Sequence, residues 1–196
     1  MEDFIHLHVH TYYSILDGQS PVEKLVDKAV ANGMRGMAIT DHGNMFGVKE
    51  LYNYCNKING KLKEQGKEPF KPIFGCEVYF TPDETLARDR KPELYHMVLF
   101  AQNEKGYVNL MQTVSEAAVQ GFYYKPRVTL DNLRRHAKGM ICTSACIAGI
   151  IPKYIDRGDM EGAIKWAETF RDTFDPGDFY IEIQEHGIIT DNGLTD

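Results

Sequence analysis

Segments with the sequence patterns of strands and of helices alternate along this chain of 196 residues. Short apolar or alternating stretches predict strands, and longer amphipathic stretches predict helices. The predicted strands are residues 4–10, 36–40, 69–80, 95–102, 139–149 (a strand and a turn) and 178–187, and the predicted helices are residues 22–33, 48–65, 104–119 and 151–174. Strands separated by helices of this length indicate parallel βα units, either in a doubly wound sheet or in a barrel.

The composition fits one well-packed domain, residues 1–196, in the cytoplasm. Hydrophobic residues make up 43% of the chain, and no stretch resembles a linker, a secretory signal or the roughly 18 apolar residues of a membrane span. In a reducing compartment, the four cysteines are expected as thiols or metal ligands rather than as disulfides. A net charge of −6 argues against a broad basic surface for nucleic acid, so an anionic substrate would need bound cations or another domain.

Three of the seven histidines stand at alternate positions near the N-terminus, where the stretch HLHVH contains His6, His8 and His10. In a β-strand, residues two apart point to the same face. The three imidazoles would therefore line one side of the strand, and the apolar residues between them would line the other. This is the geometry of metal ligands.

Further candidate ligands lie in or beside the other predicted strands. They are Asp41 and His42 after the second strand, Glu77 within the third, His96 at the start of the fourth and Cys146 after the fifth. Glu77 has the strongest claim, because a carboxylate inside an apolar strand is costly unless it is paired or bound to a metal. An open doubly wound sheet concentrates its site at one switch point, whereas a barrel gathers every strand around a common centre. The distribution of ligands therefore favours a barrel.

Six stretches, in this order and spacing, resemble the PHP (polymerase and histidinol phosphatase) domain at the N-terminus of bacterial replicative DNA polymerase III alpha subunits: HLHVHTYYSILDG, AITDHGNMFG, GCEVYF, YHMVLFAQN, GFYYKPRV and TSACIAG. The resemblance runs the whole length of the chain. GFYYKPRV and the context of DHGNMFG are more similar to the polymerase branch than to the small stand-alone phosphatases. The resemblance implies an α/β fold, a distorted seven-stranded (β/α) barrel whose pocket holds up to three divalent metals.

Carried over residue by residue, the resemblance implies seven metal ligands, namely His8, His10, Asp17, His42, Glu77, His96 and Cys146. The three metal sites that it implies are His8 and His10 with Glu77, Glu77 with His96 and Cys146, and Asp17 with His42. Glu77, His8 and His10 are the expected catalytic residues. A mixed donor set of this kind does not select one metal firmly. Zn²⁺ is the first expectation, and Mn²⁺, Fe²⁺ or Mg²⁺ are the alternatives.

The family pattern also has an Asp-x-His pair on a late strand, which would complete the first and third metal sites. This sequence ends at GIITDNGLTD without that pair. We therefore expect the closing strand to lie beyond residue 196 in a longer polypeptide, and the barrel to be incomplete within this sequence.

Four other residues near these motifs have a less specific interpretation. Asp41 either orients an imidazole or serves the turn in which it lies. His6 matches no ligand position and is interpreted as structural, and His136 as a solvated residue at a charged helix end. His186 could border the pocket.

The stretch GFYYKPRV combines aromatic rings with cations. Tyr123, Tyr124, Lys125 and Arg127 suit single-stranded DNA that passes the mouth of a pocket, because bases stack on rings and phosphates pair with cations. Tyrosine and arginine are also common anchors of protein interfaces. Docking against the polymerase body therefore stays open as the alternative.

Two functions of different classes follow from the resemblance. The first is a metal-dependent phosphoesterase acting on a mispaired 3′ DNA end, a 3′–5′ proofreading exonuclease within a DNA-directed DNA polymerase. The second is a structural, non-catalytic metal-binding module that supports the other polymerase domains in cis and a proofreading subunit. A stand-alone phosphatase of the histidinol-phosphate type is disfavoured by the polymerase-type motifs. No membrane partner is expected.

Overall fold

The computed structural model describes residues 4–184. The chain divides into two compact units, Met1–Cys76 and Glu77–Asp196. Strand β2 (Lys71–Phe80) contributes its first residues to one unit and its last residues to the other. The expectation of a single domain over residues 1–196 stays a prediction, and His186 lies outside the described residues.

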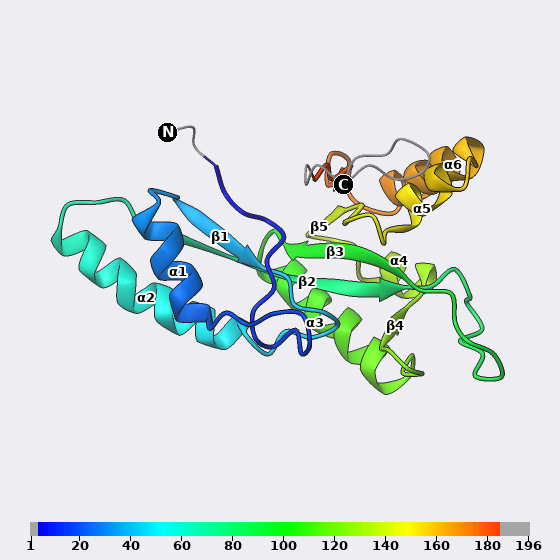
Figure 1. Ribbon diagram of the computed structural model, residues 1–196, viewed down its shortest axis with the longest axis horizontal. Helices are drawn as coiled ribbons and strands as arrows, with labels where there is room; N and C mark the ends of the chain where they lie inside the picture. Colours follow the sequence, from blue (N-terminus) through cyan, green and yellow to red (C-terminus); the bar gives the residue numbers. More distant parts are fainter. Residues whose placement is uncertain (1–3, 185–196) are drawn as a thin grey trace. The chain divides into compact units, whose positions relative to one another are not determined.

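The first unit is built on a parallel pair of strands. Strand β1 (Gly36–Ile39) pairs with the beginning of β2, from Gly36 opposite Lys71 to Ile39 opposite Phe74. Helices α1 (Val22–Ala31) and α2 (Val48–Glu64) flank β1 in the sequence, and α1 packs against both β1 and α2 (Figure 1). The predicted helices 22–33 and 48–65 and the predicted strand 36–40 are thus confirmed within two residues at each end.

The first predicted strand is not formed as a regular ladder. The backbone N–H of Ala38 donates to the carbonyl of His6 at 2.9 Å, and that of Thr40 donates to Val9 at 2.8 Å. The donors Ala38 and Thr40 are two positions apart, but the acceptors His6 and Val9 are three apart. The N-terminal segment therefore does not keep the regular register of a parallel strand pair. Strict alternation of side chains therefore fails between His6 and Val9, and Leu7 is 47% exposed.

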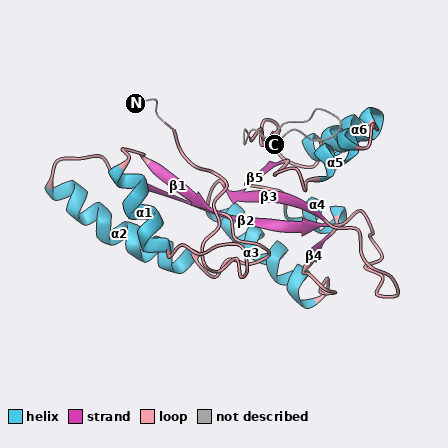
Figure 2. Cartoon of the chain, in the orientation of Figure 1, coloured by secondary structure: helices cyan, strands magenta, loops and turns pink. Residues whose placement is uncertain are grey.

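The second unit contains the remaining strands and four helices. In chain order, its elements after β2 are β3 (Tyr95–Ala101), α3 (Glu104–Val119), β4 (Arg127–Val128), α4 (Leu130–His136), β5 (Met140–Thr143), α5 (Ile150–Asp156), α6 (Met160–Arg171) and β6 (Phe179–Tyr180). Within it, β2 has β4 and β3 as neighbours, and the path continues to β5 and then β6. Figure 2 shows the irregular connection between β2 and β3.

Three features of this unit differ from the sequence prediction. Strands β3 and β5 are antiparallel, whereas the predicted parallel arrangement is found for β5 and β6, and β2 also pairs with β4 in parallel. The helix predicted at residues 151–174 is interrupted near Gly158, which has a φ of +80°. The two resulting helices, α5 and α6, pack against each other (Figure 1). Strand β4 had not been predicted, and of α4 only the helix end at His136 had been. The α/β class is confirmed, and the six described strands form a sheet that is not closed.

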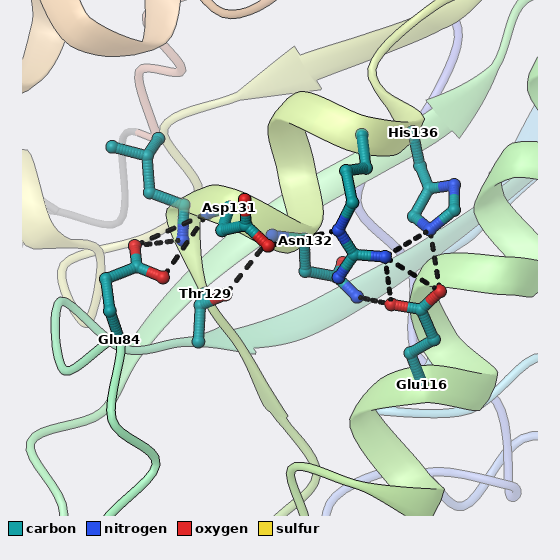
Figure 3. Close-up of polar contacts among 8 residues, drawn as sticks. Glu84, Glu116, Thr129, Asp131, Asn132 and His136 are labelled. Carbon is teal, nitrogen blue, oxygen red and sulfur yellow. Dashed lines mark hydrogen bonds and ion pairs between the residues drawn. The ribbon is translucent and has the colours of Figure 1, made fainter.

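Helix α4 begins at a cluster of hydrogen bonds that Figure 3 shows. The hydroxyl of Thr129 accepts from the backbone N–H of Asn132 at 3.2 Å, which caps the helix. Glu84 Oε1, from the connection after β2, accepts from the backbone N–H of Leu130 at 3.0 Å and of Asp131 at 3.3 Å. The negative charge at the beginning of the helix also suits the helix dipole.

The end of α4 is tied to α3 through Glu116. This carboxylate accepts from Arg135 Nη1 at 2.8 Å, from His136 Nε2 at 2.9 Å and from Asn132 Nδ2 at 2.8 Å (Figure 3). Burial acts to raise the pKa of Glu116, but the hydrogen bonds from His136 and Arg135 outweigh it and lower this pKa below its ordinary value. The interpretation of His136 as a solvated side chain is wrong, because its side chain is only 12% exposed.

Candidate metal centre

Four of the predicted ligands, His8, His10, Asp17 and His42, lie in the first unit and are linked by ring contacts and one ion pair. The rings of His10 and His42 stack with their centroids 4.2 Å apart, and the ring of His8 lies 5.3 Å from that of His10. Asp17 Oδ2 lies 2.8 Å from His42 Nε2. The unit therefore gathers three imidazoles and a carboxylate, a donor set that suits a borderline divalent metal such as zinc.

A tight loop after His10 brings Asp17 back to the histidines. The backbone N–H groups of Asp17 and Gly18 both donate to the carbonyl of Ser14, at 3.0 and 2.8 Å. A Cβ atom on Gly18 would lie 1.8 Å from the carbonyl oxygen of Thr11, so only glycine fits at this position. The stretch between the two ligands is thus shaped by backbone contacts that a larger residue would break.

The remaining three predicted ligands form a second cluster, in the second unit. Glu77 is a β2 residue with 1% exposure, and its Oε1 lies 2.9 Å from His96 Nδ1. Cys146 Sγ, in the loop after β5, lies 3.6 Å from the same His96 nitrogen and 3.9 Å from Glu77 Oε1. A carboxylate, an imidazole and a thiol from three separate elements therefore meet at one point.

The electrostatics of this second cluster are those of a buried ion pair. Burial acts to lower the pKa of His96, but hydrogen bonds with Cys146 and Glu77 outweigh it and raise this pKa to about 9. His96 is therefore the cation that compensates the buried charge of Glu77. Carboxylate, imidazole and thiolate are all ligands of divalent zinc, so the residues present fit a metal that would replace the proton on His96.

The basic and aromatic segment divides into exposed and buried members. Tyr124 is 70% exposed with φ +61°, and Lys125 is also exposed. Lys125 Nζ lies over the ring of Tyr79 at 4.9 Å, and that ring meets the ring of His96 edge-on at 5.5 Å. Tyr79 was not singled out in the sequence, and through it the segment adjoins the second cluster.

Arg127 differs from its neighbours because its side chain is buried. Its guanidinium donates to three backbone carbonyls, those of Gly121 at 2.8 Å, Ala87 at 2.9 Å and Leu86 at 2.8 Å. The residue is 1% exposed. This burial assigns the side chain to the packing of the connection after β2. The predicted contact of Arg127 with nucleic acid stays a prediction.

Sequence comparison matches the chain to a known family. The chain matches the PHP domain over residues 6–186. It is 40% identical to the DNA polymerase III subunit alpha of Treponema pallidum (strain Nichols) and 41% identical to that of Borreliella burgdorferi, each over 188 residues that make up 94% of this chain. The match covers 15% of the length of each relative.

Two solved structures are similar at low identity. An amidohydrolase from Chromobacterium violaceum is 19% identical, with a TM-score of 0.38, over 86% of this chain and 50% of the other. A putative metal-dependent phosphoesterase from Bifidobacterium adolescentis is 17% identical, with a TM-score of 0.35, over 90% of this chain and 59% of the other.

Within residues 4–184, every helix is too short or too polar to span a lipid bilayer.

Proposed function

This chain belongs to the PHP domain family, and from that premise we propose that it carries the multi-metal phosphoesterase site of a bacterial replicative DNA polymerase III alpha subunit. In the whole protein, the proposed reaction is the 3′–5′ exonucleolytic removal of a mispaired nucleotide during DNA replication in the cytoplasm. The rest of the polymerase, DNA with a 3′ end and a proofreading subunit are the proposed partners.

The proposed ligands are the members of the two clusters, His8, His10, Asp17 and His42 in the first unit and Glu77, His96 and Cys146 in the second. Bound divalent metals, Zn²⁺ first and Mn²⁺, Fe²⁺ or Mg²⁺ as alternatives, would polarise the phosphodiester and lower the pKa of an attacking water. Within this scheme the imidazoles bind and orient, and Glu77 supplies the buried negative charge. Glu77, His8 and His10 are the proposed catalytic residues.

One observation carries the proposal most directly, the burial of Glu77 at 1% exposure beside His96 and Cys146. Burying a carboxylate is unfavourable unless a partner compensates its charge, and His96 supplies one such partner. A thiol adds little to a purely structural ion pair, whereas it is a preferred ligand of zinc. The three donors together favour a metal site over a structural pair.

The substrate would approach an acidic chain of net charge −6. Exposed Lys125, beside Tyr79, is the described cation best placed to meet a phosphate near the second cluster. Exposed Tyr124, with Tyr123, whose ring it meets at 4.7 Å, offers a surface on which a base of single-stranded DNA can stack. A short single-stranded 3′ end is therefore the proposed substrate.

One feature also favours a non-catalytic metal-binding module. Glu77, His96 and Cys146 contact one another through their side chains, so the same residues suit a structural site. The two functions differ in a single measurable respect. A catalytic site cleaves a 3′ end, and a structural site only holds metal.

The deciding experiment uses the full-length protein and a primer with a mismatched 3′ end. Cleavage is measured with Zn²⁺, Mn²⁺ and Mg²⁺ in turn, for the wild type, Glu77→Gln and the matched variant His6→Ala. We expect metal-dependent loss of 3′ nucleotides in the wild type and in His6→Ala but not in Glu77→Gln. A fully metallated wild type that leaves every 3′ end intact would reject the exonuclease and favour the structural module.

A further inference from the structure

Three polar side chains are fully buried beneath the histidines of the first unit. Thr11, Ser14 and Asp41 are 0%, 1% and 1% exposed. Asp41 Oδ1 accepts from the backbone N–H of Thr11 at 2.7 Å and from the hydroxyl of Ser14 at 2.8 Å, and its Oδ2 accepts from the hydroxyl of Thr11 at 2.8 Å. Three donors thus converge on the two oxygens of one carboxylate.

The serine hydroxyl connects this carboxylate to both neighbouring ligands. Ser14 Oγ lies 2.9 Å from His10 Nδ1, and it also accepts from the backbone N–H of His42 at 3.1 Å. A serine hydroxyl has one hydrogen to donate and two lone pairs that accept. Its hydrogen is given to Asp41, and one lone pair is taken by the amide of His42.

The donor in the remaining contact is therefore the imidazole. With the hydrogen of Ser14 committed to Asp41, the 2.9 Å contact is a hydrogen bond only if His10 Nδ1 carries a proton. In a neutral imidazole, a proton on Nδ1 puts the lone pair that can bind a metal on Nε2. The order of hydrogen bonds from Asp41 to Ser14 to His10 thus selects one tautomer.

We infer that Ser14 and Asp41 are positioning residues, which hold His10 as its Nδ1–H tautomer and so make Nε2 the ligand atom for a divalent cation. The inference rests on the proposed function, since it assigns His10 a metal. Both residues act through His10, which Ser14 contacts directly and Asp41 reaches through Ser14. The alternative is that the buried network only shapes the loop after His10. In that case, the tautomer of His10 would have no effect on metal affinity.

The first test reads the tautomer itself and needs no metal. The histidine side chains of the ¹⁵N-labelled metal-free chain are observed by long-range ¹H–¹⁵N correlation at about pH 8, where an unperturbed imidazole is neutral. The His10 signals are assigned by their loss in His10→Gln. We expect a protonated Nδ1 and an unprotonated Nε2 in the wild type. The opposite tautomer in the wild type overturns the inference, whatever the variants do.

The second test links the tautomer to metal affinity. Ser14→Ala removes the acceptor for His10 Nδ1. Thr11→Val is its control, because it removes a hydrogen bond to Asp41 and the acceptor for the backbone N–H of Tyr13 without removing a contact of His10. Zn²⁺ affinity is measured by competition with a chelating dye for each folded variant. Loss of a partner that orients a ligand costs about 10- to 100-fold in affinity. We expect that loss in Ser14→Ala, together with a mixture of tautomers, and near wild-type behaviour in Thr11→Val.

The outcomes separate this inference from the proposed function. Equal Zn²⁺ affinity in the wild type and Ser14→Ala overturns the positioning role and leaves the metal site standing. A wild type with the expected tautomer that binds no Zn²⁺ rejects the metal site, and the positioning role with it. If Ser14→Ala does not fold, the tautomer of the wild type still decides, because its measurement requires no substitution.

Discussion

The ammonium group of Lys125 lies 4.9 Å from the centre of the Tyr79 ring. A cation over an aromatic face is held there by the charge distribution of the ring. Tyr79 in turn contacts His96, so an exposed positive charge is fixed beside the cluster that contains Glu77. In the proposed reaction, this charge is expected to contact a phosphate of the DNA.

Replacing Lys125 with alanine is expected to weaken the binding of single-stranded DNA by the full-length protein. Loss of one phosphate contact lowers the salt dependence of binding, by about 0.7 in the log–log slope for a single strand. Fluorescence anisotropy at several salt concentrations measures both effects. Lys105→Ala, an exposed substitution on α3, is the control, and equal behaviour of the two variants would argue against a role for Lys125.

Substitution of Arg127 is expected to affect stability rather than DNA binding. Arg127→Met keeps much of the volume but leaves three carbonyls without their donor. Because buried polar groups that lose their partners are costly, we expect the free energy of unfolding to fall by about 3 kcal/mol or more. Urea denaturation measures this loss. A stable Arg127→Met protein that binds DNA poorly would instead support the original sequence prediction for this residue.

The parts of the fold that were predicted well are those with strong local signals. Helix α3 was predicted at residues 104–119 and has the same bounds in the structure. Its apolar periodicity is regular, and Asn103 at its beginning accepts from the backbone N–H of Gly106 at 3.0 Å. Strand β2 is likewise a long run of apolar residues, and its predicted end at Phe80 is correct.

The parts that were missed depend on contacts distant in the sequence. Strand β4 has two residues and α4 has seven, so neither is long enough to show a period. Strand β3 pairs with β5 in the antiparallel direction. The local sequence of a strand does not determine which strand it pairs with or in which direction. Burial of Arg127 is of the same kind, because its acceptors at Leu86 and Ala87 lie about 40 residues away.

In the candidate site, too, residues with a local sequence signal were predicted and residues that depend on distant contacts were not. The spacing of His8 and His10, and the position of Glu77 inside an apolar strand, marked these residues in the sequence. Ser14 carried no signal, because a serine in a loop is ordinary, and its role is visible only once Asp41, 27 positions later, accepts its hydrogen. Asp41 was interpreted either as orienting an imidazole or as serving its turn. The hydrogen bonds from Ser14 to its carboxylate and between Ser14 and His10 favour the first interpretation.

Glu116→Ala is expected to destabilise the protein in a pH-dependent way. The substitution removes the acceptor shared by Arg135, His136 and Asn132, at a cost of about 1 to 2 kcal/mol for a partly exposed group at neutral pH. Because the folded-state pKa of Glu116 is lowered, its contribution is present above the pKa of the unfolded chain and is lost as the pH falls through the folded-state pKa.

The difference in stability between wild type and Glu116→Ala should therefore be constant near neutral pH and should shrink in acid, below the ordinary range of a glutamate. Urea denaturation at a series of pH values measures it. Glu68→Ala, an exposed substitution, is the control and should show little effect at any pH. A difference that grows as the pH falls would contradict the assigned direction of the pKa shift.

Metal content should depend more on Glu77 than on any histidine outside the clusters. Glu77 is the buried carboxylate that His96 and Cys146 both contact. Its replacement by glutamine keeps the shape and removes the charge, so a cation bound at this cluster would lose its compensation. His6 is exposed, and His6→Ala is the matched control. After dialysis against a weak chelator, elemental analysis should find metal in the wild type and in His6→Ala and a marked loss in Glu77→Gln. Equal loss in both variants, with circular dichroism showing both folded, would mean that the metal is held elsewhere and that the assignment of Glu77 is wrong.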